Sequence, residues 1–498
     1  WSIGPYEYDN TPFPQIIYVS EPTNGGDDGH PLGTRQAPFA SLARAYDIAR
    51  DPPPALPNGP RADVMEIRIA EGSYDMETPN MPDIDTGPDI HILGGYDKTS
   101  WARNSKTIIT ELFRNTATDV FTYSGGAITG GSLLEGFTLK SNFATGTTRS
   151  LVIQAGAQPE IRNNILIGGD SDISIPILVM NSGPHIIGNT FIGGTANPVG
   201  QSFGIFLQDS GGTEVKNNDI HGGTAVTTAG IFCDNSPVLI TNNRIDAGTG
   251  TTTSYGLSIQ NTNGSTINGN HIYGGEGSNI SYGVNFQDNF NTSLINNVIH
   301  GGSASTQDSL GVEIQGGDVS VVLANNTIYG GQGNNFTFGI RTGGTAHPAM
   351  INNIIIAGDS PAGTDYSFFE GGTLPPENFF HNLLLAGPGV SATPYRSSTR
   401  GTFNHTVAAL EADLNANGST AAGNMIDEDD PPVSYFINFN NFIPGINYDE
   451  FINAENWQLN GGGRENAAQG GQDIPGLVDF DRDGKPRTGP WSIGAYEY

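Results

Sequence analysis

The chain has 498 residues, of which 51 are acidic and 21 basic, so its formal net charge is −30. A field of this sign repels nucleic acids, anionic lipids and polyanionic sugars, and no apolar run reaches the ~18–20 residues that a transmembrane helix needs. A single cysteine, Cys233, excludes an internal disulfide and a cysteine-rich zinc site.

The two ends of the chain carry nearly the same octapeptide. Residues 1–8 are Trp-Ser-Ile-Gly-Pro-Tyr-Glu-Tyr, and residues 491–498 differ from them only by Ala in place of Pro. Two explanations stay open: the chain is one unit of a tandem-repeat protein, which we favour, or its ends are matching strands of a subunit that joins others head to tail. Both predict other copies of the chain as partners. The residues expected at such an interface are Trp1, Ile3, Tyr6, Tyr8, Trp491, Ile493, Tyr496 and Tyr498.

The first elements are predicted to form an N-terminal cap. After a tail or strand at residues 1–15, the segment 16–62 contains a strand at 16–19 and a short helix at 41–50. Ser41 is a suitable N-cap residue, and apolar residues recur on one face of the helix that follows it. Such a helix would cover the open end of a repeat array, which otherwise exposes apolar side chains and unpaired strand edges.

Residues 63–394 contain a repeated phrase, Asn-Asn-x-Ile-x-Gly-Gly, without a helical pattern. Its second Asn recurs every 25 to 29 residues, a period typical of solenoids whose units bury their apolar faces against their neighbours. The apolar residue two places later is predicted to build the core. The second Asn of the successive copies is Asn164, Asn189, Asn218, Asn243, Asn270, Asn297, Asn326, Asn353 and Asn382.

A second phrase, such as Gly204-Ile205-Phe206-Leu207, precedes the Asn pairs, and its alternation directs every second side chain inward. Cys233 takes an inward position, so we expect a small buried hydrophobic residue rather than a nucleophile. Both sides of the triplets 165–167, 354–356 and 383–385 are apolar, and so are four outward positions of the second phrase. These surfaces are predicted to be covered by the terminal segments or by a partner. The four outward positions, which we add to the expected interface, are Val152, Leu178, Phe206 and Phe232.

The repeat lapses after residue 394, and residues 395–498 are predicted to form an irregular segment that packs back along the array. Within it, Asp479, Asp481 and Asp483, followed by Gly, match the first half of a calcium-binding loop. The twelfth position is Pro490 instead of the bidentate Glu that completes such a loop. We favour a plain turn here and keep Ca²⁺ as the one cofactor that the sequence indicates.

Two sets of stretches resemble known proteins. Ile17-Tyr18-Val19-Ser20 and residues 67–74 are similar to the start of secreted right-handed parallel β-helix proteins of the pectin-lyase-like superfamily. Residues 481–487 and 492–497 resemble the C-terminal region of bacterial surface proteins called choice-of-anchor Q. The resemblance implies an all-β, right-handed parallel β-helix with three strands per turn, an extracellular or bacterial cell-surface location, and no shared activity. It also implies that the Asn column forms an inner hydrogen-bonded ladder, because each amide can donate and accept.

Two hypotheses about function follow. We favour a structural protein without enzymatic activity, a rod unit of a surface fibre, layer or adhesin-type stalk. The alternative is a carbohydrate-active protein, either a polysaccharide lyase or a glycan-binding module, although the Gly-His-Gly and Arg-Ile-Lys tripeptides of polygalacturonase-like enzymes do not occur. Its candidate catalytic residues are His221, Asp246 and Tyr273, which share an outward column. The simpler interpretation of that column is a solvent-facing stack of His and Tyr, and an intermediate one is a sugar-binding stripe.

Overall fold

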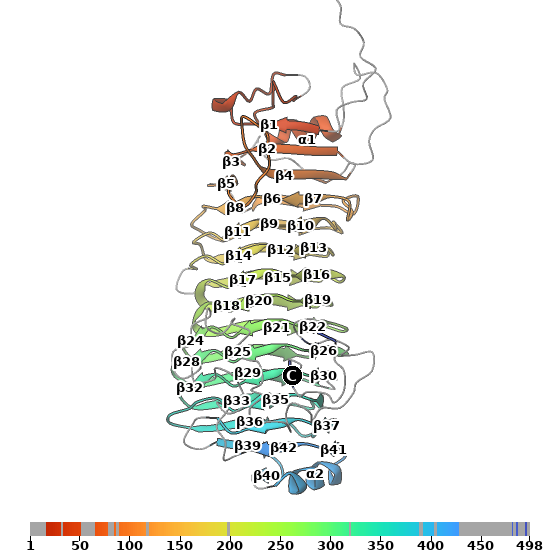
Figure 1. Cartoon of the computed structure of the whole chain (residues 1–498). Coiled ribbons are helices and arrows are strands. Elements are labelled where there is room, and N and C mark those ends of the chain that lie inside the picture. Colours follow the sequence, from red (N-terminus) through yellow and green to blue (C-terminus); the bar gives the residue numbers. More distant parts are fainter. Residues whose placement is uncertain are drawn as a thin grey trace, which may run out of the picture.

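The computed structural model describes residues 16–427, except 31–32, 51–64, 78–83, 86–88, 116–118, 197–199, 318–319, 388–391 and 403–405, together with residues 481, 485–486 and 494–495. The chain forms a parallel β-helix of about twelve turns, which confirms the predicted fold class (Figure 1). No helix in the described part is long and apolar enough to span a bilayer.

Three sheets run the length of the solenoid, and we call them A, B and C in the order in which each turn adds a strand to them. Their strands pair in parallel, apart from the antiparallel edge strand β40, and they stay in register except for one shift each between β2 and β4 and between β18 and β21. Equivalent side chains of successive turns therefore stack at a spacing of ~4.8 Å.

The strands of each sheet are as follows. Sheet A contains β1 (Ile16–Val19), β2 (Met65–Ala70), β4 (Ile90–Tyr96), β7 (Leu133–Glu135), β10 (Glu160–Arg162), β13 (His185–Ile187), β16 (Thr213–Lys216), β19 (Val238–Thr241), β22 (Thr266–Asn268), β26 (Thr292–Ile295), β30 (Val321–Ala324), β34 (Ala349–Ile351), β37 (Asn378–Phe380) and β41 (Thr420–Ala422). Sheet B contains β3 (Gly72–Asp75), β5 (Thr110–Arg114), β8 (Thr138–Ser141), β11 (Ile165–Ile167), β14 (Thr190–Ile192), β17 (Asp219–His221), β20 (Arg244–Asp246), β23 (His271–Tyr273), β27 (Val298–His300), β31 (Thr327–Tyr329), β35 (Ile354–Ile356), β38 (Leu383–Leu385) and β42 (Met425–Asp427). Sheet C contains β6 (Asp119–Ser124), β9 (Thr147–Gln154), β12 (Ile173–Met180), β15 (Gln201–Gln208), β18 (Thr224–Asp234), β21 (Thr249–Gln260), β25 (Ile280–Gln287), β29 (Asp308–Gln315), β33 (Phe336–Thr342), β36 (Thr364–Glu370), β39 (Ala392–Ser397) and β40 (Gly401–Thr402), with an extension of β24 (Glu276–Gly277), β28 (Ser303–Ala304) and β32 (Gln332–Gly333).

Columns of apolar side chains fill the interior. Sheet C contributes Cys233, which is fully buried between Leu207 and Ile259 of the neighbouring strands. Burial raises the pKa of its thiol, as expected for a packing residue. Sheet B contributes the fully buried residues that follow the Asn pairs, namely Leu166, Phe191, Ile220, Ile245, Ile272, Ile299, Ile328, Ile355 and Leu384.

The two residues of each Asn pair have different roles. The first adopts a left-handed conformation, with φ of 53° at Asn163 and 56° at Asn352, which explains why Gly188 and Gly269 replace it in two copies. The second is buried, and its side-chain amide donates to the carboxamide oxygen of the next copy at 3.0–3.3 Å along the whole series. This ladder continues beyond Asn382 to Asn424.

A second polar column, which the periodicity did not predict, lines the turn from sheet B to sheet C. Several of its hydroxyls donate to carbonyl groups of the Gly-Gly turns, as Ser202 does to Gly194 at 2.9 Å, Ser281 to Gly274 at 2.9 Å and Ser309 to Gly302 at 3.2 Å. These side chains satisfy turn carbonyls that would otherwise be buried without a partner. The fully buried members are Thr148, Ser174, Ser202, Thr228, Ser254, Ser281, Ser309, Thr337 and finally Asp365.

A helix closes each end of the solenoid (Figure 1). The predicted cap is α1 (Leu42–Arg50), and Ser41 accepts a hydrogen bond from the Arg44 N–H at 3.2 Å; the 3₁₀ turn η1 (Pro22–Asn24) precedes it. At the other end lies α2 (Val407–Ala416), which buries Leu410 and Leu414. The strands β39, β41 and β42, which flank this helix in the sequence, extend sheets C, A and B by one more strand each. Of the segment expected to be irregular from residue 395, the described residues up to 427 therefore form strands and a helix joined by turns.

Candidate functional site

The predicted site residues His221 and Asp246 lie on adjacent turns of sheet B, on β17 and β20. Nδ1 of His221 lies 3.4 Å from Oδ2 of Asp246, and its Nε2 lies 3.5 Å from Oδ1 of Asp219. The hydrogen bonds to Asp219 and then Asp246 raise the pKa of His221 to about 9. The imidazole is therefore protonated at neutral pH and does not serve as a general base.

Tyr273, on the next turn, does not complete an exposed site. Only 6% of Tyr273 is exposed, and His300 and Tyr329 in the same column are 3% and 1% exposed. Their rings pack on one another, with centroids 5.1 Å apart for Tyr273 and His300 and 4.8 Å apart for His300 and Tyr329. The interpretation of this column as a solvent-facing stack or a sugar-binding stripe is therefore wrong for these three residues.

Residues 494 and 495 lie on this part of sheet B. The N–H of Ala495 donates to Oγ1 of Thr327 at 3.2 Å, and a Cβ added to Gly494 would lie 2.7 Å from Cδ1 of Ile354. The triplets 354–356 and 383–385 are at most 1% exposed, in line with the cover predicted for them.

Most of the predicted interface and calcium residues lie outside the described residues. Asp481 is described and 5% exposed, and its Oδ1 accepts the Lys485 N–H at 2.7 Å, as in a plain turn. The described residues contain no cluster of three or more potential metal ligands. The residues of these two predictions that lie outside are Trp1, Ile3, Tyr6, Tyr8, Trp491, Ile493, Tyr496, Tyr498, Asp479 and Asp483.

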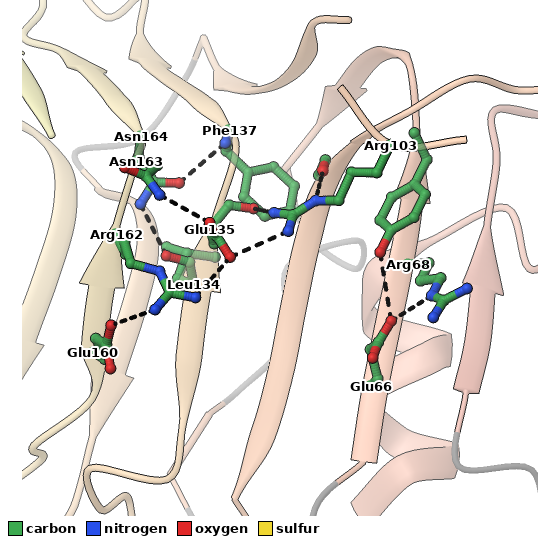
Figure 2. A network of polar contacts seen from close by, with 12 residues as sticks. Glu66, Arg68, Arg103, Leu134, Glu135, Phe137, Glu160, Arg162, Asn163 and Asn164 are labelled. Carbon is green, nitrogen blue, oxygen red and sulfur yellow. Dashed lines mark hydrogen bonds and ion pairs between the residues drawn. The ribbon is translucent and has the colours of Figure 1, made fainter. Parts of the chain in front are cut away.

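A network of charged side chains covers the outer side of sheet A at the N-terminal turns (Figure 2). Glu135 at its centre accepts hydrogen bonds from Arg103 at 3.2 Å, Arg162 at 3.1 Å and Asn163 at 2.9 Å. Burial alone would raise the pKa of Glu135, but the hydrogen bonds of Arg162 and Asn163 and the charge of Arg103 outweigh it and lower the pKa. Each of these groups is engaged, so the network braces neighbouring strands and offers no free acid or base.

The outer side of sheet C carries partly exposed aromatic rings on four successive turns. Phe206 and Phe232 meet edge to face with centroids 5.3 Å apart, whereas the rings of Tyr255 and Tyr282 are parallel with centroids 5.0 Å apart. Burial raises the pKa of both phenols, and the charge of Glu313 adds to this effect. The two phenols therefore remain neutral hydrogen-bond donors at physiological pH.

A row of amides runs beside these rings at equivalent positions of the strands. The exposed side chains of Gln208 and Gln287 have no hydrogen-bond partner within the described part of the chain, and neither do the hydroxyls of Tyr255 and Tyr282. Donors and acceptors on this surface are thus available to a ligand. We call it the Tyr–Gln face, and it consists of Phe206, Phe232, Tyr255, Tyr282, Gln208, Gln260, Asn285 and Gln287.

The aromatic residues of the adjoining turns explain the apolar outward positions of the sequence. Val152 and Leu178 are only 2% and 5% exposed, because they pack with Phe203, Phe206 and Phe232 on the same face. These residues cover one another and need no added segment. Ile165 of sheet B, by contrast, remains 43% exposed, so the cover predicted for its triplet is not formed by the described residues.

The two tyrosines of the Tyr–Gln face were not among the predicted site residues, because the second phrase begins at its Gly and does not include the residue before it. Tyr255 and Tyr282 stand immediately before Gly256 and Gly283 of the second phrase. The same position in other turns holds Phe203, Leu310, Phe338 and Tyr366, so an aromatic signal was present one residue upstream.

An ion-pair cluster borders the Tyr–Gln face on its C-terminal side. Nε of Arg341 lies 3.0 Å from both carboxylate oxygens of Glu313, and its Nη1 lies 3.7 Å from Oδ2 of Asp308. Glu313 is 1% exposed and Arg341 20% exposed in their side chains, so each neutralises the other in a largely dry setting.

The extension of sheet C encloses a recess of about 320 Å³, at the low end of the ~300–1,000 Å³ usual for ligand pockets. Ser303, Gln332, Asn334 and Asp359 supply its polar lining. Burial raises the pKa of Asp359. The recess has no second charged group among its lining residues, and we assign no ligand to it.

Comparison with known proteins supports the fold. A family model described as "Right handed beta helix region" matches residues 126–288, about a third of the chain. No protein with a curated description matches. Similar solved structures include pectate lyase Pel9A, with 10% identity, 97% of this chain and 96% of that chain covered and a TM-score of 0.37. They also include the A-module of the Azotobacter vinelandii mannuronan C-5 epimerase AlgE6, with 13% identity, 73% of this chain and 91% of that chain covered and a TM-score of 0.35. Bacteriophage CBA120 tailspike protein 3 has 13% identity, with 82% of this chain and 61% of that chain covered and a TM-score of 0.33.

Proposed function

We propose that the chain binds glycans through the Tyr–Gln face. The carrying observation is the pair Tyr255 and Tyr282, two neighbouring phenols whose hydroxyls have no partner in the described part of the chain. The unpaired amide of Gln287 lies on the same strand as Tyr282, five residues further along. Phenol and carboxamide groups donate and accept, as a ligand with many hydroxyls requires. Phe206 and Phe232 add apolar surface for the C–H groups of a sugar ring.

The arrangement of these groups favours a linear ligand. They project from β15, β18, β21 and β25, which are consecutive strands of one sheet, so they form rows along the solenoid axis at ~4.8 Å per turn. Side chains on paired strands hold their geometry better than side chains on loops. A polymer of repeating units can engage several turns at once, which raises its affinity without any single deep pocket.

The geometry supports glycan binding, and the described residues do not supply a free catalytic acid or base at the face. Glu313, the carboxylate beside the tyrosines, is engaged by Arg341, and His221 is protonated and lies on another sheet. Polysaccharide lyase activity therefore stays an untested prediction.

A glycan array followed by calorimetric titration of the best ligand tests the proposal. Tyr255→Phe and Tyr282→Phe keep the rings and remove only the hydroxyls, and Gln287→Ala removes one amide. Each should weaken binding roughly five- to tenfold, the effect of one hydrogen bond worth ~1 kcal/mol. Gln158→Ala, an exposed amide in the turn after sheet C, is the matched control and should leave affinity unchanged. Wild-type affinity in all three face variants would sink the proposal.

The structural-rod hypothesis also stays a prediction, as do the extracellular location and self-association. Helix α1 packs against β1 and β2 at one end of the described solenoid, and α2 packs against β41 at the other. A rod that displays a glycan-binding surface is compatible with a stalk, and analytical ultracentrifugation of the full chain would test whether copies associate.

A further inference from the structure

We infer that the Tyr–Gln face is selective for uncharged glycans and rejects those with carboxylate or sulfate groups. This inference rests on the proposed function and names the ligand class. It is carried by the charges on and around the face, which are carboxylates without an available cation.

The amide row contains one carboxylate. Asp234 of β18 occupies the position between Gln208 and Gln260 on the neighbouring strands. Its Oδ1 accepts a hydrogen bond from Asn261 at 3.0 Å, and among the described residues no Lys, Arg or His pairs with it. A ligand bound along the amide row therefore lies next to the half-buried negative charge of Asp234.

The cation at the border of the face is already neutralised. Nε of Arg341 lies 3.0 Å from Glu313, and its Nη1 lies 3.7 Å from Asp308. Together with Asp234, the face and its border therefore contain three carboxylates and one guanidinium. An anionic ligand could reach Arg341 only by breaking the pair and leaving Glu313 buried and uncompensated, which is strongly unfavourable.

Two further arginines of sheet C lie outside the face. Arg149 of β9 pairs with Asp119, and Arg396 of β39, four strands beyond β25, donates to the Tyr366 hydroxyl at 2.7 Å. Arg103 and Arg162 lie on the outer side of sheet A, where Glu135 and Glu160 engage them (Figure 2). The chain as a whole carries a formal charge of −30, which repels polyanions at long range. Local pairing and the overall field thus act in the same direction.

The experiment uses two forms of one polymer on the full chain. Homogalacturonan oligosaccharides and their fully methyl-esterified forms share a backbone and differ in charge, and a neutral array ligand serves as the reference. At low salt the acid form should bind at least about tenfold more weakly than the ester, because like charges meet. The difference should shrink as salt screens it.

Asp234→Lys provides the matched variant. It should shift the acid-to-ester affinity ratio at least about tenfold towards the acid form. The same exchange at Asp47, an exposed residue of α1, should leave the ratio as it is. Equal or tighter binding of the acid form, or an unchanged ratio in Asp234→Lys, would overturn the inference while leaving glycan binding intact. Failure to bind any neutral glycan would overturn both proposals.

Discussion

Nδ1 of His221 lies 3.4 Å from Oδ2 of Asp246 on the next turn, and its Nε2 lies 3.5 Å from Oδ1 of Asp219 on its own strand. The pKa of His221 accordingly rises from its ordinary ~6.5 to about 9. Because the folded pKa exceeds the unfolded value, the native state binds the proton more tightly. The stabilisation is complete below about pH 6.5 and is lost as the pH rises through 9.

His221→Asn should lower the free energy of unfolding by about 1–2 kcal/mol at neutral pH, discounted because the imidazole is partly exposed. At a pH above 9 the variant and the wild type should be equally stable. Urea unfolding across this pH range measures both. His185→Asn is the control, since its side chain is 52% exposed beside Glu214 and its loss should cost less than ~0.5 kcal/mol. A wild type whose stability does not fall between neutral and alkaline pH would contradict the proposed stabilisation.

The inner framework could be predicted because it depends on local repetition. A constant spacing of Asn and Ile places equivalent residues on stacked strands whatever their distant surroundings, as the columns of Asn243 and Ile245 show. The left-handed first Asn was missed, because periodicity records which residues recur and says nothing of φ. Its replacement by Gly188 and Gly269 was the available signal.

Asn243→Ala should remove one rung of the ladder. Asn243 donates to the Val215 carbonyl at 2.8 Å and accepts from the Asn218 N–H at 2.9 Å, and both groups would be left buried without a partner. With ~1–3 kcal/mol for each, we expect a loss of roughly 2–6 kcal/mol in the free energy of unfolding. Chemical denaturation measures it. Asn335→Ala, an exposed amide bonded to Asp308, should cost less than ~1 kcal/mol, and equal losses would refute the ladder as a source of stability.

The periodicity could not predict the C-terminal turn or the Tyr–Gln face, for two different reasons. Asn424 follows Asn382 by 42 residues, because α2 is inserted in that turn, so the period of 25 to 29 residues breaks although the ladder continues. On the outer face of sheet C the residue type changes from turn to turn, since no shared core constrains it. The burial of Tyr273 could not be predicted either, because repetition along the chain does not show which side chains pack over one another or which distant residues lie on that sheet, as Ala495 does at Thr327.

Asp365 ends the inner hydroxyl column as a buried carboxyl. Oγ1 of Thr337 donates to its Oδ1 at 2.5 Å, while Oδ2 has no partner among the described residues. Burial raises the pKa of Asp365 to about 6. The folded state therefore holds the proton more tightly than the unfolded chain, whose pKa is ~3.8–3.9, and stability is lost as the pH rises through 6.

Asp365→Asn should abolish this loss and stabilise the protein at neutral pH by about 2 kcal/mol, since no carboxylate then has to ionise in the interior. Thermal unfolding between about pH 4 and 7 follows the effect. Asp47→Asn, on the exposed face of α1, should leave the pH profile as it is in the wild type. A variant that retains the wild-type slope would show that another group titrates there.

Arg400 secures the C-terminal cap through Glu370, which is fully buried. Its Nη1 and Nη2 lie 2.8 Å and 2.5 Å from the carboxylate oxygens of Glu370, and its Nε lies 2.7 Å from Asp413 of α2. Arg400→Met should destabilise the protein by about 3–5 kcal/mol, because Glu370 is left buried without a counter-charge. Glu370→Gln in the same chain should restore much of that loss, and a double-mutant cycle by urea unfolding measures the coupling. Additive effects of the two substitutions would mean that the pair contributes nothing as a pair, and exchange protection of α2 amides in Arg400→Met would then remain at the wild-type level.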